Sequence, residues 1–164
     1  MTAALNFSTI PLSKVPANEL IQDANKDRPV VLVVDNEAIV ADSLSLILDQ
    51  FGFATMTAYG SAAALEIAAV IPPELLICEL ALPHMNGFDL AKKITAIAPD
   101  CDVVLLSGRA TSTHFAETSS NRNYEFAFLN KPFHPTVLLD AIAEPLKKRS
   151  QRFRTHLVAS EDIA

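Results

Sequence analysis

Polar residues whose types suit phosphate and cation chemistry stand at the ends of four apolar runs. They are Asp35, Asn36 and Glu37 after VVLVV, Glu79 at the end of LLICE, Ser107 at the end of VVLLS, and Lys131 after FLN. If the runs are parallel strands, these side chains meet beyond the carboxyl ends of one sheet, where open α/β sheets bind their ligands. We therefore expect one pocket in which carboxylates, a hydroxyl and an ammonium group face one another.

The elements that would position this pocket alternate between strand and helix. Compact apolar runs predict strands at 30–35, 53–59, 74–80, 102–107 and 125–130. Apolar residues at helical spacing predict helices between the strands, and Pro135 can start another after the last strand. Segment 108–124 is rich in Ser, Thr and Asn, so we expect only a short or frayed helix there. This alternation predicts a doubly wound α/β domain with a five-stranded parallel sheet.

Each predicted helix has an apolar face directed at the core. The residues expected on these faces are Val40, Leu44, Ile47, Leu48 and Phe51; Phe88, Ala91, Ile94 and Ile97; and Leu138, Ala141, Ile142 and Leu146. Gly52 can end the first helix with a positive φ. Ser61 is expected to cap the alanine-rich second helix, which stops before Pro72.

Length and composition favour one domain with tails. A chain of 164 residues, half of them apolar, can bury one substantial core. We assign residues 29–148 to the domain, 1–28 to a mobile N-terminal arm, and 149–164 to a tail that is basic and then acidic. The basic cluster at 147–154 is expected to be a solvated helix end.

Charge and hydropathy argue against several function classes. The net charge of -6 and the pI near 5.1 disfavour binding to nucleic acid or to an anionic membrane. The longest apolar region, 62–83, is interrupted by glutamates and a Pro-Pro pair, so it does not predict a membrane span. The first residues lack a secretory signal, and we expect a cytoplasmic protein. Cys78 and Cys101 are expected to be buried thiols, and the four histidines surface residues.

The segments VLVVDNE, LLICELALPHMNGFDL, VVLLSG and FLNKPF, taken in order, resemble the receiver domain of bacterial two-component response regulators. The resemblance implies a flavodoxin-like fold with strand order 2-1-3-4-5. It also implies an aspartate at the end of the third strand that accepts phosphate from a histidine kinase, next to a Mg²⁺ ion. Matched position by position, it makes Asp35, Asn36 and Glu37 the acidic pocket, Glu79 the acceptor position, Ser107 and Lys131 the phosphoryl contacts, Phe128 the switch aromatic, and Asp35, Glu79 and the Ala81 carbonyl the metal ligands.

Two residues depart from the family pattern. Glu79 replaces the aspartate nucleophile, and its extra methylene moves the attacking oxygen by roughly 1.5 Å, which can cost about a hundredfold in phosphoryl transfer. Two interpretations of Glu79 stay open. It imitates the phosphorylated state by contacting Lys131 and Ser107, or it is a structural acid that holds an inactive receiver. Asn36 replaces an acid and weakens Mg²⁺ binding, and it is also a candidate helix N-cap.

The leading hypothesis is a stand-alone, degenerate receiver that acts by protein–protein contact, is not an enzyme and requires no cofactor. Its contact face would comprise the fourth helix, fifth strand and fifth helix, its partner would be a signalling protein such as a histidine kinase, and it would be a monomer or weak homodimer. A second hypothesis is a working acceptor, phosphorylated by a histidine kinase or a small phosphodonor. A third, a flavodoxin-like enzyme that binds a flavin or nucleotide, is disfavoured because DNEAIV stands where a glycine-rich phosphate loop would be.

Overall fold

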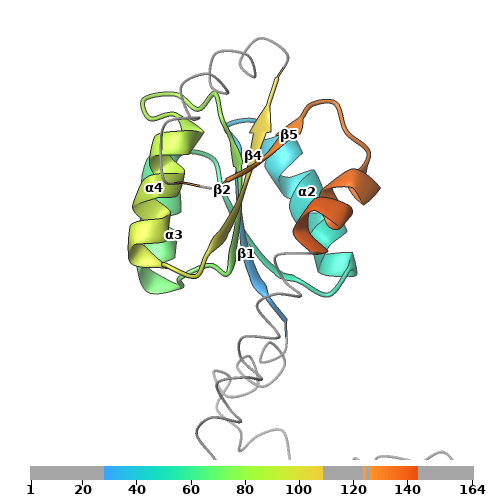
Figure 1. Cartoon of the computed structure of the whole chain (residues 1–164), viewed down its shortest axis with the longest axis horizontal. Helices are drawn as coiled ribbons and strands as arrows, with labels where there is room; N and C mark the ends of the chain where they lie inside the picture. The colour runs from blue at the N-terminus through green and yellow to red at the C-terminus, as the bar shows by residue number, and fades with distance from the viewer. Residues whose placement is uncertain (1–27, 109–123, 125, 144–164) are drawn as a thin grey trace, which may run out of the picture.

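A five-stranded parallel sheet in the order β2-β1-β3-β4-β5 forms the centre of the protein (Figure 1). The computed structural model describes residues 28–108, 124 and 126–143. The strands are β1 (Val30–Val34), β2 (Ala54–Ala58), β3 (Leu75–Glu79), β4 (Asp102–Ser107) and β5 (Ala127–Asn130). This order confirms the predicted 2-1-3-4-5 topology.

Helices cover both faces of the sheet (Figure 1). α2 (Ala38–Gln50) and a helix over residues 135–143 lie on one face, and α3 (Ser61–Val70) and α4 (Gly87–Ile97) lie on the other. The central strands β1 and β3 are buried almost throughout, which accounts for their unbroken apolar sequences. The arrangement is the predicted doubly wound fold.

Two apolar cores form, one on each face of the sheet. The core beneath α3 and α4 includes Leu32, Val34, Leu76, Cys78, Leu90, Ile94 and Leu105. The core beneath α2 and the helix at 135–143 includes Val31, Val33, Leu44, Leu48, Leu75, Ile77, Val104, Leu138 and Ile142. Each central strand serves both cores because successive side chains of a strand point to opposite faces.

The end of α2 differs from its prediction in one residue. Phe51 was expected in the core, but it is 61% exposed. Because α2 ends at Gln50 and Gly52 turns the chain with a φ of 90°, Phe53 enters the core in its place. The positive φ predicted for Gly52 is confirmed. Leu44 and Leu48 are buried as predicted, whereas Val40 and Ile47 are only partly buried.

Two other helix predictions are corrected. Gly60, and not Ser61, is the N-cap of α3, which has no side-chain cap hydrogen bond. Ile97 is 42% exposed because it is the last residue of α4, although Phe88, Ala91 and Ile94 are buried as predicted.

The strand predictions differ from the structure only at their ends, as β1 stops before Asp35 and β2 and β3 each lack one predicted residue on either side. β5 starts at Ala127 and not at residue 125. Arg28, assigned to the arm, contacts the domain, since its Nη2 donates to the carbonyls of Asp49 and Phe53. The predicted weak helix, the rest of the arm, Leu146 and the tail lie outside the described residues. Across the part that the structure describes, no helix is long and apolar enough to cross a membrane.

Candidate functional site

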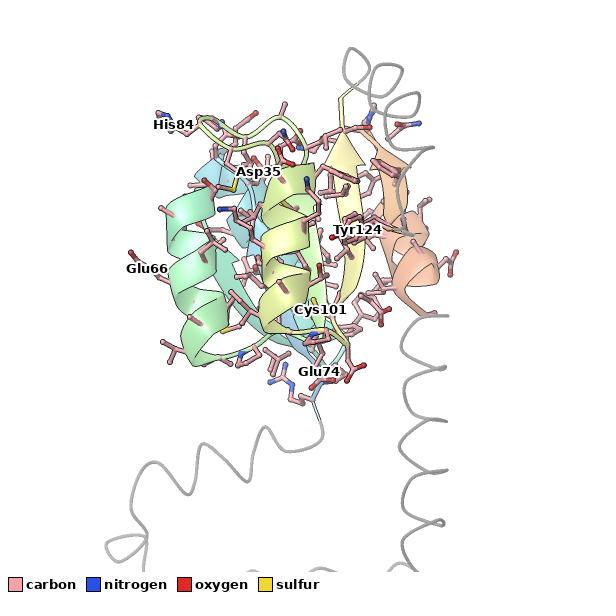
Figure 2. The ribbon with its side chains drawn as sticks, turned by 60° about the vertical axis from the view of Figure 1, so that its left-hand side comes forward. Asp35, Glu66, Glu74, His84, Cys101 and Tyr124 are labelled. Atoms are coloured by element: carbon pink, nitrogen blue, oxygen red, sulfur yellow. The ribbon has the colours of Figure 1, made fainter. Side chains whose placement is uncertain are left out.

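The carboxyl ends of β1, β3 and β5 bring three predicted site residues together. Asp35 directly follows β1 and is 1% exposed, and Glu79 is the last residue of β3 and is 7% exposed. Lys131 follows β5 and extends its side chain to both of them. Figure 2 shows Asp35 at the same end of the domain as His84, opposite the end that carries Glu74 and Cys101. The pocket predicted from the strand ends therefore has these three residues at its centre.

The Lys131 ammonium group links the two carboxylates. Its Nζ lies 2.5 Å from Glu79 Oε2 and 3.0 Å from Asp35 Oδ2. Burial by itself would lower the pKa of Lys131, but hydrogen bonds to Glu79 and Asp35 and their charges outweigh burial, so the pKa lies above its ordinary value. The lysine is thus held in its charged form by both acids.

Backbone N–H groups hold the other oxygen of each carboxylate. Asp35 Oδ1 accepts a hydrogen bond of 2.9 Å from the N–H of Glu37. Glu79 Oε1 accepts one of 3.0 Å from the N–H of Ala81. Each acid therefore contacts a backbone N–H two residues further along the chain with one oxygen and Lys131 with the other. Such charge-assisted bonds fix the orientation of both side chains.

Ser107 is fully buried at the end of β4, and its hydroxyl contacts β5. Its Oγ donates to Asn130 Oδ1 at 2.9 Å, and its carbonyl accepts from the Lys131 N–H at 2.8 Å. The Ser107 hydroxyl thus contacts Asn130, whereas the sequence suggested that it would contact Glu79. Sequence reasoning missed Asn130, because only the β4–β5 register shows that it lies opposite Ser107.

Of the three polar residues after β1, only Asp35 lies in the buried pocket. Asn36 and Glu37 are both exposed. Glu37 is the N-cap of α2, without a side-chain cap hydrogen bond, so Asn36 does not cap this helix. The alternative N-cap interpretation of Asn36 is therefore wrong.

The loop after β3 depends on a glycine that the sequence reasoning did not single out. A Cβ on Gly87 would lie 2.3 Å from the carbonyl oxygen of Glu79 and 3.0 Å from Cys78 Sγ. The Gly87 N–H donates to the Leu80 carbonyl at 2.8 Å, which closes the loop. The close approach of α4 to the end of β3 requires a residue without a side chain. The Asn-Gly pair at the start of α4 was the sequence feature that could have identified this glycine.

Cys78 lies behind the pocket as an inert thiol. It is fully buried, and burial, followed by the charges of Glu79 and Asp35, raises its pKa far above the ordinary range. Cys101 is also buried, so both cysteines are buried, as predicted.

Residues 31–143 match the family model described as the response regulator receiver domain. The chain belongs to this family. Among curated proteins, it is 28% identical over 131 residues to the transcriptional regulatory protein FixJ of Rhizobium meliloti, covering 80% of this chain and 59% of FixJ. It is 32% identical over 92 residues to the photosynthetic apparatus regulatory protein RegA of Cereibacter sphaeroides, covering 56% of this chain and 50% of RegA. The receiver thus spans between half and three fifths of these two relatives.

Solved structures show the same fold. A two-component transcriptional regulator AraC from Clostridium phytofermentans ISDg is similar with a TM-score of 0.66 and 25% identity, over 75% of this chain and 96% of that one. A CheY-like response regulator receiver domain protein from Methanospirillum hungatei JF-1 has a TM-score of 0.66 and 23% identity, over 77% and 99% of the two chains. The expected receiver fold is confirmed.

In this receiver, the predicted switch aromatic does not point into the pocket. Phe128 is 43% exposed. It lies opposite Leu105 in the β4–β5 register, and Leu105 belongs to the core beneath α3 and α4. The aromatic rings that do pack together on this face are Phe88, Tyr124 and Phe126, with centroids 5.4 to 6.2 Å apart. The switch role of Phe128 stays a prediction.

A Mg²⁺ ion, which the family implies, would have to compete with the groups that already contact both carboxylates of the pocket. A hard cation of this kind needs near-octahedral oxygen ligands. Here Lys131 holds one oxygen of each carboxylate and backbone N–H groups hold the others. Asn36, which would add a ligand, is exposed. Within the described ranges, no group of three or more His, Cys, Asp or Glu side chains could hold a metal ion. Weakened Mg²⁺ binding stays a prediction.

Proposed function

We propose that this receiver is degenerate and signals by protein–protein contact without phosphorylation of Glu79. The observation that carries the proposal is the bridge in which Lys131 Nζ contacts both Glu79 Oε2 and Asp35 Oδ2. The lysine that would bind a phosphoryl group is thereby already paired with the carboxylate that would have to accept one.

The chemistry of phosphoryl transfer supports this proposal. The attacking oxygen has to be free and in line with the leaving group, and metal ions have to neutralise the developing charge. Glu79 contacts Lys131 with Oε2 and the Ala81 N–H with Oε1, so attack by either oxygen would disturb a charge-assisted bond. The extra methylene of glutamate adds a displacement of roughly 1.5 Å, enough to cost about a hundredfold.

The surroundings of Glu79 favour a structural acid over an imitation of the phosphorylated state. An imitation would bring Glu79, Ser107 and an inward Phe128 together. The Ser107 hydroxyl donates to Asn130, and Phe128 is 43% exposed. Of the contacts that an imitation would need, Glu79 makes only the one with Lys131. We therefore propose that the ion pair holds the receiver in one fixed state, which its partners read directly.

Intact-mass spectrometry after incubation with acetyl phosphate and Mg²⁺ tests the proposal. The wild-type chain should gain no phosphoryl group. In the Glu79→Asp variant the phosphoryl group should pass from acetyl phosphate to the introduced carboxylate, with acetate as the leaving group. Glu66→Asp, which shortens an exposed glutamate on α3, is the matched control and should stay unmodified. A stoichiometric adduct located on Glu79 of the wild type would contradict the proposal.

A further inference from the structure

A groove of about 530 Å³ runs along the outer side of α4. One end is formed by His84, Met85 and Asn86 of the loop after β3, and the side by Lys92, Lys93 and Ala96 of α4. Each of these residues is exposed or half-exposed, so the groove is open to solvent. Its volume falls in the range of sites that accept a side chain or a small ligand.

The charges in this groove are unlike those of the whole chain. Asp89, its one acid, faces Lys92 at 2.5 Å and accepts a hydrogen bond from Asn86 Nδ2 at 2.8 Å. Lys93 is exposed and forms no ion pair within the described part of the chain. The groove therefore carries an uncompensated cation on a protein whose net charge is -6. Local positive potential of this kind attracts carboxylates.

The backbone at one end of the groove is strained. The Met85 N–H donates to the Pro83 carbonyl at 2.8 Å across His84, whose φ is 68°. A three-residue turn with positive φ is rare in proteins, and such strain is concentrated at functional positions. His84 is exposed at this turn. The turn places His84 and Met85 at the end of the groove.

The same loop connects the groove to the buried pocket. Its first part donates the Ala81 N–H to Glu79 Oε1, and its last part donates the Gly87 N–H to the Leu80 carbonyl. Glu79 is therefore hydrogen-bonded to the loop that forms one end of the groove.

We propose that the groove binds a segment of a partner protein that carries one large apolar side chain and an adjacent acidic residue. Met85, Ala96 and the lysine methylenes would receive the apolar group, and Lys93 would face the acid. A small molecule fits less well, because small-ligand sites enclose most of the ligand surface and this groove is open. The inference rests on the proposed function, for which it supplies the contact surface.

Selection of a phage-displayed library of random peptides against the full chain tests the inference. Selected peptides are then synthesised with a fluorescein label and measured by fluorescence anisotropy. They should share an acidic residue next to a large apolar one. Ala96→Glu should weaken their binding by about tenfold or more, because it fills the groove and repels the acid. Ala69→Glu is the matched control, since both alanines are exposed and penultimate in their helices, and it should leave binding unchanged.

A second variant keeps the test decisive if Ala96→Glu folds poorly. Lys93→Gln should weaken binding by about twofold to fivefold and reduce its dependence on salt, as expected for an exposed charge. Selected peptides that lack acidic residues, or that bind both groove variants as tightly as the wild type, would overturn the inference. Phosphorylation of Glu79 combined with groove-dependent binding would refute the proposed function and leave the groove intact.

Discussion

The ammonium nitrogen of Lys131 lies 2.5 Å from Glu79 Oε2, so the last residue of β3 and the residue after β5 are joined across the end of β4. The same ammonium reaches Asp35 Oδ2 at 3.0 Å. Three strand ends thereby share one ion-pair network. Its acids are almost fully buried and its lysine is partly exposed, with 28% of that side chain accessible.

Removing the lysine should destabilise the domain. Lys131→Met leaves two buried carboxylates without their cation, and we expect the free energy of unfolding to fall by about 3 kcal/mol. This is near the lower end for a buried ion pair because Lys131 is partly exposed. Urea denaturation monitored by circular dichroism measures the change. Lys93→Met, at an exposed position without an ion pair, should change stability by less than about 0.5 kcal/mol. Equal effects of the two variants would refute the structural role of Lys131.

The raised pKa of Lys131 predicts a loss of stability in alkaline solution. Its folded-state pKa lies above the ordinary value of about 10.4, so the folded state holds this proton more tightly than the unfolded state. The resulting stabilisation is complete below the ordinary value and is lost as the pH rises through the folded-state pKa. Urea denaturation across this alkaline range should show the decline in the wild type and in Lys93→Met. In Lys131→Met the part of the stability loss that is due to the Lys131 proton should be absent. An alkaline loss of stability as large as that of the wild type would contradict the role of Lys131.

Gly87 should tolerate no side chain. In Gly87→Ala the new Cβ would meet the Glu79 carbonyl oxygen at 2.3 Å, a backbone atom that cannot move without shifting β3 or α4. We expect a destabilisation of about 1 to 3 kcal/mol, as in other overpacked sites. Gly60→Ala is the control, because a Cβ at Gly60 meets nothing within 4 Å. Thermal unfolding of the two variants gives the comparison, and a Gly87→Ala domain as stable as Gly60→Ala would show that the loop adapts.

The N-caps of α2 and α4 should respond differently to alanine. Asn86 Oδ1 accepts from the Asp89 N–H at 2.8 Å, so Asn86→Ala should cost about 1 kcal/mol of unfolding free energy. Glu37 caps α2 without a side-chain hydrogen bond, and Glu37→Ala should cost less than about 0.5 kcal/mol. Chemical denaturation of both variants measures the difference. The reverse order of the two effects would disprove the assignment of the caps.

The amino-acid sequence by itself determined the central apolar strands and the edge of the sheet at which Asp35, Glu79 and Lys131 meet. These follow from local patterns, because a buried parallel strand needs an unbroken apolar run and its polar end residue falls at a defined edge. The four-segment resemblance then ordered the strands. Most core positions of α4 and of the helix at 135–143 were also readable, since their spacing is set by the helix period, although Ile97 is exposed and Ala141 is only partly buried.

Contacts between segments were decided only by the tertiary structure. Ser107 bonds to Asn130 and not to Glu79, because the β4–β5 register places those two residues opposite each other. Phe53 replaces Phe51 in the core, because Gly52 reverses the direction of the chain after α2. The predicted contact face extends over 109–123, outside the described residues. Sequence periodicity specifies which face of an element is apolar. The partner of a polar atom depends on distances between elements, and these are fixed only when the elements pack.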